Sequence, residues 1–397
     1  MSGLWKRAGL AGLWIAAVCL GILWCPFPGF GAENETEENG GNPLAFQDIP
    51  DLGLERVQEF LDRQYGENEL SFSALMEELV KGDVSGAGAQ IAHAFWDGAV
   101  GEARDSVRFL AQAAALGILG AVFAQAASVF PSSRIAEMGF FITYLLTFTC
   151  LTASFFTSVD TAARVVENVL DFMKVLLPSF FLAVAFAGGS ISSAALYGSV
   201  VAGVSGAQFF CGKVLFPLVK VYVLLVLAGN LSKEAVVDRL TQGLEKGIHW
   251  SLTSMAGVFL GLQMVQTMIL PYADSAKRAG IQKLVSAIPG IGAGAEAVLQ
   301  VTVGAGVLVK NTIGGAAVVL LVLLAAAPAA KLLFFLVLYQ GAAALMEPIC
   351  DRRISACAQG MAKAHRLLLE LVLAVVLLFA LSLGIICSST NAVYFGG

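Results

Sequence analysis

The chain has 397 residues, of which 57% are hydrophobic and only 13% are charged, and its formal net charge is −5. Soluble domains carry about 25% charged residues, so the composition excludes an ordinary water-soluble protein. Apolar stretches of spanning length fill most of the chain, which predicts an all-α, polytopic helical membrane protein. We expect about six to eight transmembrane helices with re-entrant or interfacial helices in addition, and nothing in the charge distribution indicates nucleic-acid binding.

Residues 1–32 have the pattern of a signal peptide. Lys6 and Arg7 precede a short apolar core, and small residues then stand where cleavage after Gly31 requires them. We expect the segment that follows to be exported, with a retained signal anchor as the alternative.

Residues 33–105 are the only region that could form a separate water-exposed unit, and they hold 17 acidic residues against 4 basic ones. An acidic segment after a signal is easily exported, so this region is predicted to be extracytoplasmic. It begins with an unstructured tether at 33–50. Two short amphipathic helices should follow outside the membrane, with apolar faces formed by Leu54, Val57, Phe60 and Leu61 and by Phe72, Leu75, Met76, Leu79 and Val80. They are predicted to be a cap on the membrane domain or a partner-docking module.

Residues 106–390 are predicted to form the multi-span membrane domain, and 391–397 a short tail. The domain's apolar segments lie at about 107–130, 138–158, 175–195, 197–230, 248–271, 284–309, 312–328, 331–346 and 367–387. Two amphipathic stretches with nearly balanced charge are expected to be interfacial helices: 160–174 and 231–247.

Basic loops orient this array. Lys and Arg residues at 277–283 and at 352–366 predict two cytoplasmic sides. Two crossings between these loops suffice if the chain turns near Pro328, which leaves 284–309 as a re-entrant or surface-lying segment. Three crossings are the alternative.

A short internal repeat predicts a duplicated membrane core. Asp160 and Arg164 open one amphipathic stretch, Asp274 and Arg278 open another, and each pair is followed 15 to 18 residues later by a proline. Repeated halves are common in transporters, whose broken helices often line the site. A chance match is the alternative.

The most unusual stretch is rich in glycine and contains an ionisable residue within an apolar setting. Its candidate packing or conduit residues are Pro289, Gly290, Gly292, Gly294, Glu296, Lys310, Asn311 and Gly314. Glycines four residues apart allow helices to approach closely, and a carboxylate in a membrane core could bind an ion or relay a proton. Glu296 could equally lie at the interface of a surface-lying segment.

Three lysines in apolar segments, Lys213, Lys220 and Lys310, have two interpretations. Their stems could extend toward the headgroups, or their ammonium groups could line a basic pore. No paired carboxylates, nucleophile–base set, phosphate loop or metal cluster has usable spacing. The sequence therefore predicts no enzyme, no metal and no cofactor.

Several motifs together resemble a known family. A signal, an acidic region with LxxVxxFL, and then YADSAKR, IPGIGAGAEAVLQ, GVLVKNTIG and MEPICDRR are similar to the stage III sporulation protein AE family of endospore-forming bacteria. The resemblance covers essentially the whole chain and is most specific from Asp274 to Gly315.

The resemblance implies a role that residue chemistry alone does not supply. Members of the family are expected in the mother-cell membrane around the forespore, within an assembly of stage III sporulation A-operon proteins. That assembly joins stage II sporulation protein Q of the forespore, directly or indirectly, to form a channel-like complex needed for late forespore gene expression. The resemblance implies a permease-like or export-gate-like component, and a self-sufficient ion- or proton-coupled transporter is the alternative.

Overall fold

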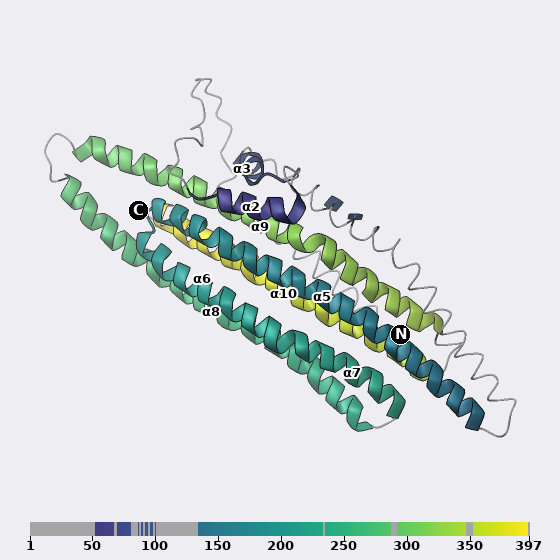
Figure 1. Cartoon of the computed structure of the whole chain (residues 1–397). Coiled ribbons are helices and arrows are strands. Elements are labelled where there is room, and N and C mark those ends of the chain that lie inside the picture. Colours follow the sequence, from purple (N-terminus) through teal and green to yellow (C-terminus); the bar gives the residue numbers. More distant parts are fainter. Residues whose placement is uncertain are drawn as a thin grey trace. The chain divides into compact units, whose positions relative to one another are not determined.

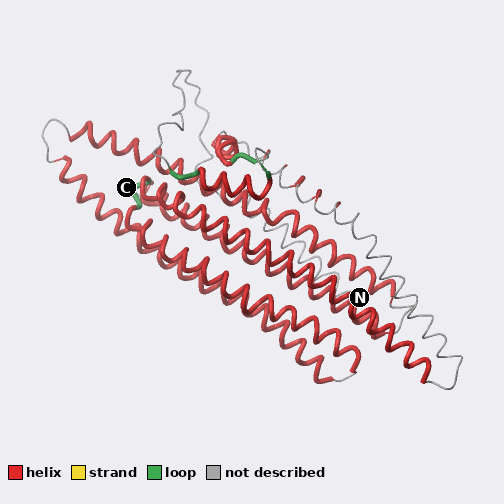
Figure 2. Tube along the Cα trace, viewed as in Figure 1, coloured by secondary structure: helices red, strands yellow, loops and turns green. Residues whose placement is uncertain are grey.

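The structure is a computed structural model, and it describes residues 52–66, 70–80, 134–232, 235–286, 292–346 and 352–395 together with a few single positions between 86 and 100. The expected signal, the tether at 33–50 and the apolar segment at 107–130 lie outside the described residues. Figures 1 and 2 show that the elements of the described part are helices. Within the described residues, five helical stretches are long and apolar enough to cross a membrane: Tyr144–Phe186, Ser190–Gly229, Arg239–Lys277, Gln300–Ala344 and Ser355–Ser389. The prediction of an all-α, polytopic membrane protein is confirmed.

Two short helices precede the bundle, as the apolar spacing predicted. Helix α2 (Glu55–Tyr65) and helix α3 (Phe72–Val80) are joined by Gln58, whose Nε2 donates to the carbonyl of Leu70 at 2.9 Å and whose Oε1 accepts from the N–H of Phe72 at 2.9 Å. Phe60 packs on Phe172 of the bundle with ring centroids 5.8 Å apart. The two helices therefore pack on the membrane domain as a cap.

Three helices of the bundle are more than 50 residues long. They are α5 (Arg134–Phe186), α8 (Ala235–Ser286) and α9 (Gly292–Met346). A helix of that length measures roughly 75 Å, whereas the hydrocarbon core of a bilayer is about 30 Å thick. Each of these helices is continuous across segments that were predicted to be separate.

The expected turn near Pro328 is therefore wrong, because α9 continues through that proline. Residues 292–309 form the first part of the same helix rather than a separate re-entrant piece. Likewise 160–174 is the middle of α5 and 235–247 the start of α8, not independent interfacial helices. A proline removes one backbone hydrogen bond and bends a helix, but packing of long apolar faces against neighbours stabilises helices more than local propensity does.

The next three elements form one continuous helical segment: α6 (Ser190–Phe210), a π-helical turn η2 (Cys211–Leu215) and α7 (Phe216–Ser232). At the end of the π-turn the N–H of Phe216 donates to the carbonyl of Cys211, five residues earlier. Pro217 follows directly, and it has no N–H to give to the turn before it. The π-turn accommodates this proline without ending the helix.

Helix α10 (Arg352–Phe395) lies in the middle of the bundle and contacts α5, α7, α8 and α9. It runs parallel to α5 in constant register: Ser158 bonds to His365, and 22 residues further along both helices Phe180 and Cys387 lie beside the same residue, Gly314. Helix α9 runs antiparallel to both and contacts each of them. The core consists of the side chains that these helices share, including Phe155, Phe172, Met173, Leu176, Phe180, Leu320, Leu368, Val375 and Phe379.

Candidate functional site

The candidate site is built around the tight turn between α5 and α6. The chain reverses within Ala187, Gly188 and Gly189, and the N–H of Gly189 donates to the carbonyl of Val184 at 3.2 Å. Gly188 has a φ of +89°, a region that side chains other than glycine rarely occupy. The turn needs glycine, and it leaves the first N–H groups of α6 without a side-chain cap of their own.

Asp274 of α8 supplies the missing cap from a different helix. Its Oδ1 accepts from the N–H of Ile191 at 2.8 Å, and its Oδ2 accepts from the N–H of Ser192 at 3.0 Å and from the Ser192 hydroxyl. The carboxylate is only 4% exposed. Unpaired N–H groups and the positive end of the helix dipole stabilise a negative charge there. One turn later Lys277 Nζ donates to the Ser190 hydroxyl at 2.8 Å, which ties α8 to α6 a second time.

Gly306 of α9 closes the same turn from another side. A Cβ at Gly306 would lie 2.8 Å from the backbone nitrogen of Ala187 and 2.9 Å from the carbonyl oxygen of Phe186. Only glycine permits this approach of two backbones. The α5–α6 turn is thus held between Asp274 and Gly306.

Two of the predicted residues follow Gly306 on the same face of α9, at intervals of four residues. Lys310 is completely buried, and its Nζ donates to the carbonyl of Cys387 on α10 at 3.2 Å. A Cβ at Gly314 would lie 2.5 Å from Cys387 Sγ and 3.3 Å from a ring carbon of Phe180. Gly314 thus packs closely between α5 and α10, and Lys310 does not extend toward headgroups. Lys213 is exposed and Lys220 partly exposed.

The other residues of the glycine-rich stretch are not brought to this turn. Gly294 is exposed and has nothing within 4 Å of a built Cβ. Gly292 and Glu296 lie in the first turns of α9, where the structure describes only the backbone, and Pro289 and Gly290 lie outside the described residues. Asn311 is half-buried, and its Oδ1 has no hydrogen-bond partner in the described part of the chain.

The two copies of the repeat motif have different surroundings. Asp274 is the buried cap, whereas Asp160 and Arg164 are exposed in the middle of α5, where Asp160 is 4.0 Å from Lys220. Arg278 lies in α8 with its side chain undescribed. The motifs therefore do not occupy equivalent positions.

His365, which no pattern in the sequence singled out, is completely buried between α5 and α10. Its Nδ1 donates to the carbonyl of Met361 at 2.9 Å, and its Nε2 is 3.0 Å from the Ser158 hydroxyl. Its ring lies against Phe155, Phe335 and Tyr339, with centroids 5.5, 5.4 and 5.0 Å away. The neighbouring Lys363 and Arg366 concealed this residue, because they made the segment resemble a solvated loop.

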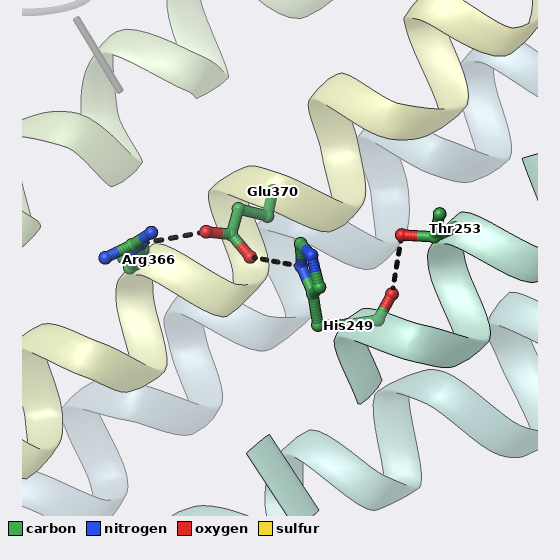
Figure 3. A network of polar contacts seen from close by, with 4 residues as sticks. All are labelled: His249, Thr253, Arg366 and Glu370. Atoms are coloured by element: carbon green, nitrogen blue, oxygen red, sulfur yellow. Dashed lines mark hydrogen bonds and ion pairs between the residues drawn. The ribbon is translucent and has the colours of Figure 1, made fainter. Parts of the chain in front are cut away.

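A polar network joins α8 to α10 on the surface (Figure 3). Glu370 lies between Arg366, whose Nε is 2.8 Å from Oε1, and His249, whose Nδ1 is 3.7 Å from Oε2. Thr253 donates to the carbonyl of His249 at 3.0 Å. No group of three or more His, Cys, Asp or Glu side chains in the described ranges is arranged to hold a metal ion.

Comparison with known proteins gives two matches that agree. A family model described as stage III sporulation protein AE matches residues 70–390. The stage III sporulation protein AE of Bacillus subtilis (strain 168) is 22% identical over 369 residues, which is 91% of this chain and 92% of that protein. No solved structure matches the chain. The family match covers the Asp274 cap, Gly306 and Lys310 together with all the long helices, and the chain therefore belongs to the stage III sporulation protein AE family.

Proposed function

We propose that this chain is a non-enzymatic, permease-like or export-gate-like membrane component of a channel complex between the mother cell and the forespore. The observation that carries the proposal is the family match over residues 70–390, which spans the whole described membrane bundle. On this proposal the chain lies in the mother-cell membrane around the forespore, with its acidic region outside the cytoplasm.

The clamp around the α5–α6 turn supports a role in an assembly that must keep its shape. Asp274 of α8 and Gly306 of α9 hold the turn that joins the end of α5 to the start of α6. The proposed partners are other stage III sporulation A-operon proteins and, directly or indirectly, stage II sporulation protein Q.

Deletion of the gene in its spore-forming host tests the proposal. We expect engulfment to finish, late forespore gene expression to fail, and spores to be lost. Restoration by the wild-type gene in the mother cell, and not in the forespore, is the matched control. Normal spore yield in the deletion strain would contradict the proposal.

One observation favours a second candidate, a self-sufficient transporter coupled to ions or protons. Lys310 is fully buried among membrane helices, and ionisable residues at such positions often belong to ion or proton pathways. Purified protein in liposomes should then show coupled uptake that Lys310→Met abolishes, while Lys213→Met, at an exposed position, leaves it unchanged. A Glu296→Gln variant tests the residue that the sequence singled out.

A further inference from the structure

Two sides of the bundle's outer surface differ in charge at the same height, that is, at the same level along the helix axes. Heights can be compared because α5, α8 and α10 run parallel in fixed register. Phe259 of α8 packs on Phe379 of α10 with centroids 6.0 Å apart, and Gln263 donates to Ser382 at 2.7 Å. Phe379 is in turn level with Phe172 of α5. This follows from the constant register of the two helices, in which Ser158 lies beside His365 and Phe180 is level with Cys387. Phe172 and Phe259 therefore mark one height on opposite sides of α10.

This height lies within the part of the bundle that fits a bilayer. No Asp, Glu, Lys or Arg occurs in α8 between Lys246 and Asp274, in α10 after Glu370, or in α6. Each of these stretches exceeds the 20 residues or so that cross a bilayer, and their heights coincide. The outer face of α8 there is apolar, with Val258 74% and Leu262 52% exposed.

Helix α5 is charged at the same height. Its outward-facing stripe consists of Asp160, Arg164, Glu167, Asp171 and Lys174, spaced three or four residues apart and thus on one helix face. Asp171 and Lys174 form an ion pair at 2.8 Å with side chains 47% and 42% exposed. These two residues flank Phe172, so the charges reach the middle of the apolar belt that α8 carries.

The cap, which was expected outside the membrane, packs on the bundle at this same height and extends the charged side. Phe60 places α2 against Phe172, and the outer residues of α2 are again charged and exposed: Glu55, Arg56, Glu59 and Arg63. Figure 1 shows α2 and α3 on the side of the bundle away from α8. The bundle thus has an apolar side formed by α8 and a charged side formed by α5 and α2.

We propose that the charged stripe of α5 borders a water-filled space at the depth of the bilayer, whereas α8 faces lipid. Charged side chains in a membrane face water or protein, not acyl chains. Water is favoured because the stripe mixes three acidic with two basic residues, a pattern that is typical of a solvated helix face. Protein interfaces are instead depleted in Lys, Glu and Asp and enriched in aromatic residues.

The proposal assigns a wall of a hydrophilic passage or cavity to residues 160–174. The stripe holds three acidic and two basic residues, so this wall carries both signs of charge. It extends the proposed function without depending on it, since water access is a property of the chain in any membrane.

Variants of the full-length chain, each with one added cysteine, test the proposal. Glu167→Cys, Asp171→Cys and Lys174→Cys probe the stripe, Val258→Cys and Leu262→Cys are the controls at matched height on α8, and Lys246→Cys is the water-exposed control. The unsubstituted chain is the blank for its seven native cysteines, of which Cys211, Cys357 and Cys387 are buried and Cys150 is partly exposed. A membrane-impermeant charged methanethiosulfonate reacts with thiolates, which form in water and not in lipid. We expect the stripe positions to react at least about tenfold faster than the α8 positions.

Three outcomes would overturn the proposal. Stripe positions as slow as Val258→Cys would mean that they face lipid or are occluded, and α8 positions as fast as Lys246→Cys would mean that this height lies outside the bilayer. Stripe positions that react only after purification into lipid nanodiscs would mean that a protein partner, not water, covers them. Arg164→Cys gives a further position if one variant fails to accumulate, and normal sporulation of a deletion strain would contradict the proposed function while leaving these rates intact.

Discussion

Asp274 on α8 caps the start of α6 through Ser192, 82 residues away in the chain, by accepting hydrogen bonds from both its backbone N–H and its hydroxyl. A capping carboxylate usually comes from the first residues of the helix itself. Here that position is Gly189, which has no side chain to cap the helix and whose Cβ would already lie 3.2 Å from the carbonyl oxygen of Val184. The cap therefore depends on tertiary structure and fixes the relative position of two membrane helices.

Asp274→Ala should lower the stability of the folded protein by about 1–2 kcal/mol, because it leaves the N–H groups of α6 unpaired in a buried place. Thermal unfolding of the purified protein in detergent, followed by helical circular dichroism, measures the loss. Asp160→Ala is the matched control at the corresponding position of the repeat motif. It removes an exposed, 4.0 Å ion pair and should change stability by less than about 1 kcal/mol. Equal effects of the two substitutions would exclude a special role for the cap.

Gly306→Ala and Gly294→Ala should have opposite effects although both change a glycine of α9. The first places a methyl group 2.8 Å from the backbone of Ala187 and should destabilise the protein by about 1–3 kcal/mol. The second adds a methyl group in open space and should be neutral or stabilise the helix by up to about 1 kcal/mol. The two melting temperatures, measured side by side, decide the question. A tolerated Gly306→Ala would mean that α9 does not contact the turn this closely.

His365→Ala should be costly, because it removes the hydrogen bond between α10 and the Ser158 hydroxyl of α5 and opens a space among three aromatic rings. We expect a loss of about 2–4 kcal/mol. His249→Ala is the control for a histidine whose side chain is 71% exposed, and it should cost less than about 1 kcal/mol. The same denaturation experiment measures both, and a His365→Ala protein as stable as the wild type would show that α5 and α10 do not meet at this residue.

Phe60→Ala should release the cap from the bundle, since it removes the ring that packs on Phe172. Limited proteolysis should then cut within residues 55–80 several-fold faster, while the long helices stay resistant. Glu59→Ala changes the adjacent, exposed residue and should leave the cleavage rate as it is. If both variants are cut at the wild-type rate, the cap is held by other contacts.

The class of the protein could be read from the sequence, but the extent of its helices could not. Apolar stretches revealed the membrane domain, and the spacing of Val57 and Leu61 or of Leu75 and Leu79 revealed α2 and α3. Pro328 and the charged stretch at 160–174 were interpreted as ends, because both interrupt a helix whose neighbours are unknown. In the bundle, α5 and α9 pack on α10, and this packing stabilises each helix across the position that was interpreted as an end.

The site was predictable only in part for the same reason. The motif around Asp274 and the segment from Gly306 to Gly314 stood out, since a charge and glycines in an apolar setting are unusual. Their meeting at one turn depends on α5, α6 and α10, which come from other parts of the chain. The buried Lys310 bonds to the carbonyl of Cys387, which is 77 residues away in the chain. No local sequence pattern indicates this contact.

The π-turn before Pro217 determines which side chains of the continuous segment α6–η2–α7 face the core. Buried residues recur every four positions along this stretch: Ala207, Cys211, Leu215, Val219, Val223 and Leu227. Four residues overshoot one turn of a regular α-helix by about 40°, so such a series would spiral off the contact face within a few turns. The wider π-turn absorbs part of this drift and keeps both halves facing the core. Deleting one residue of Cys211–Leu215 would replace the bond between the Phe216 N–H and the Cys211 carbonyl by the i→i−4 bonds of a regular helix, and this correction of the drift would then be lost.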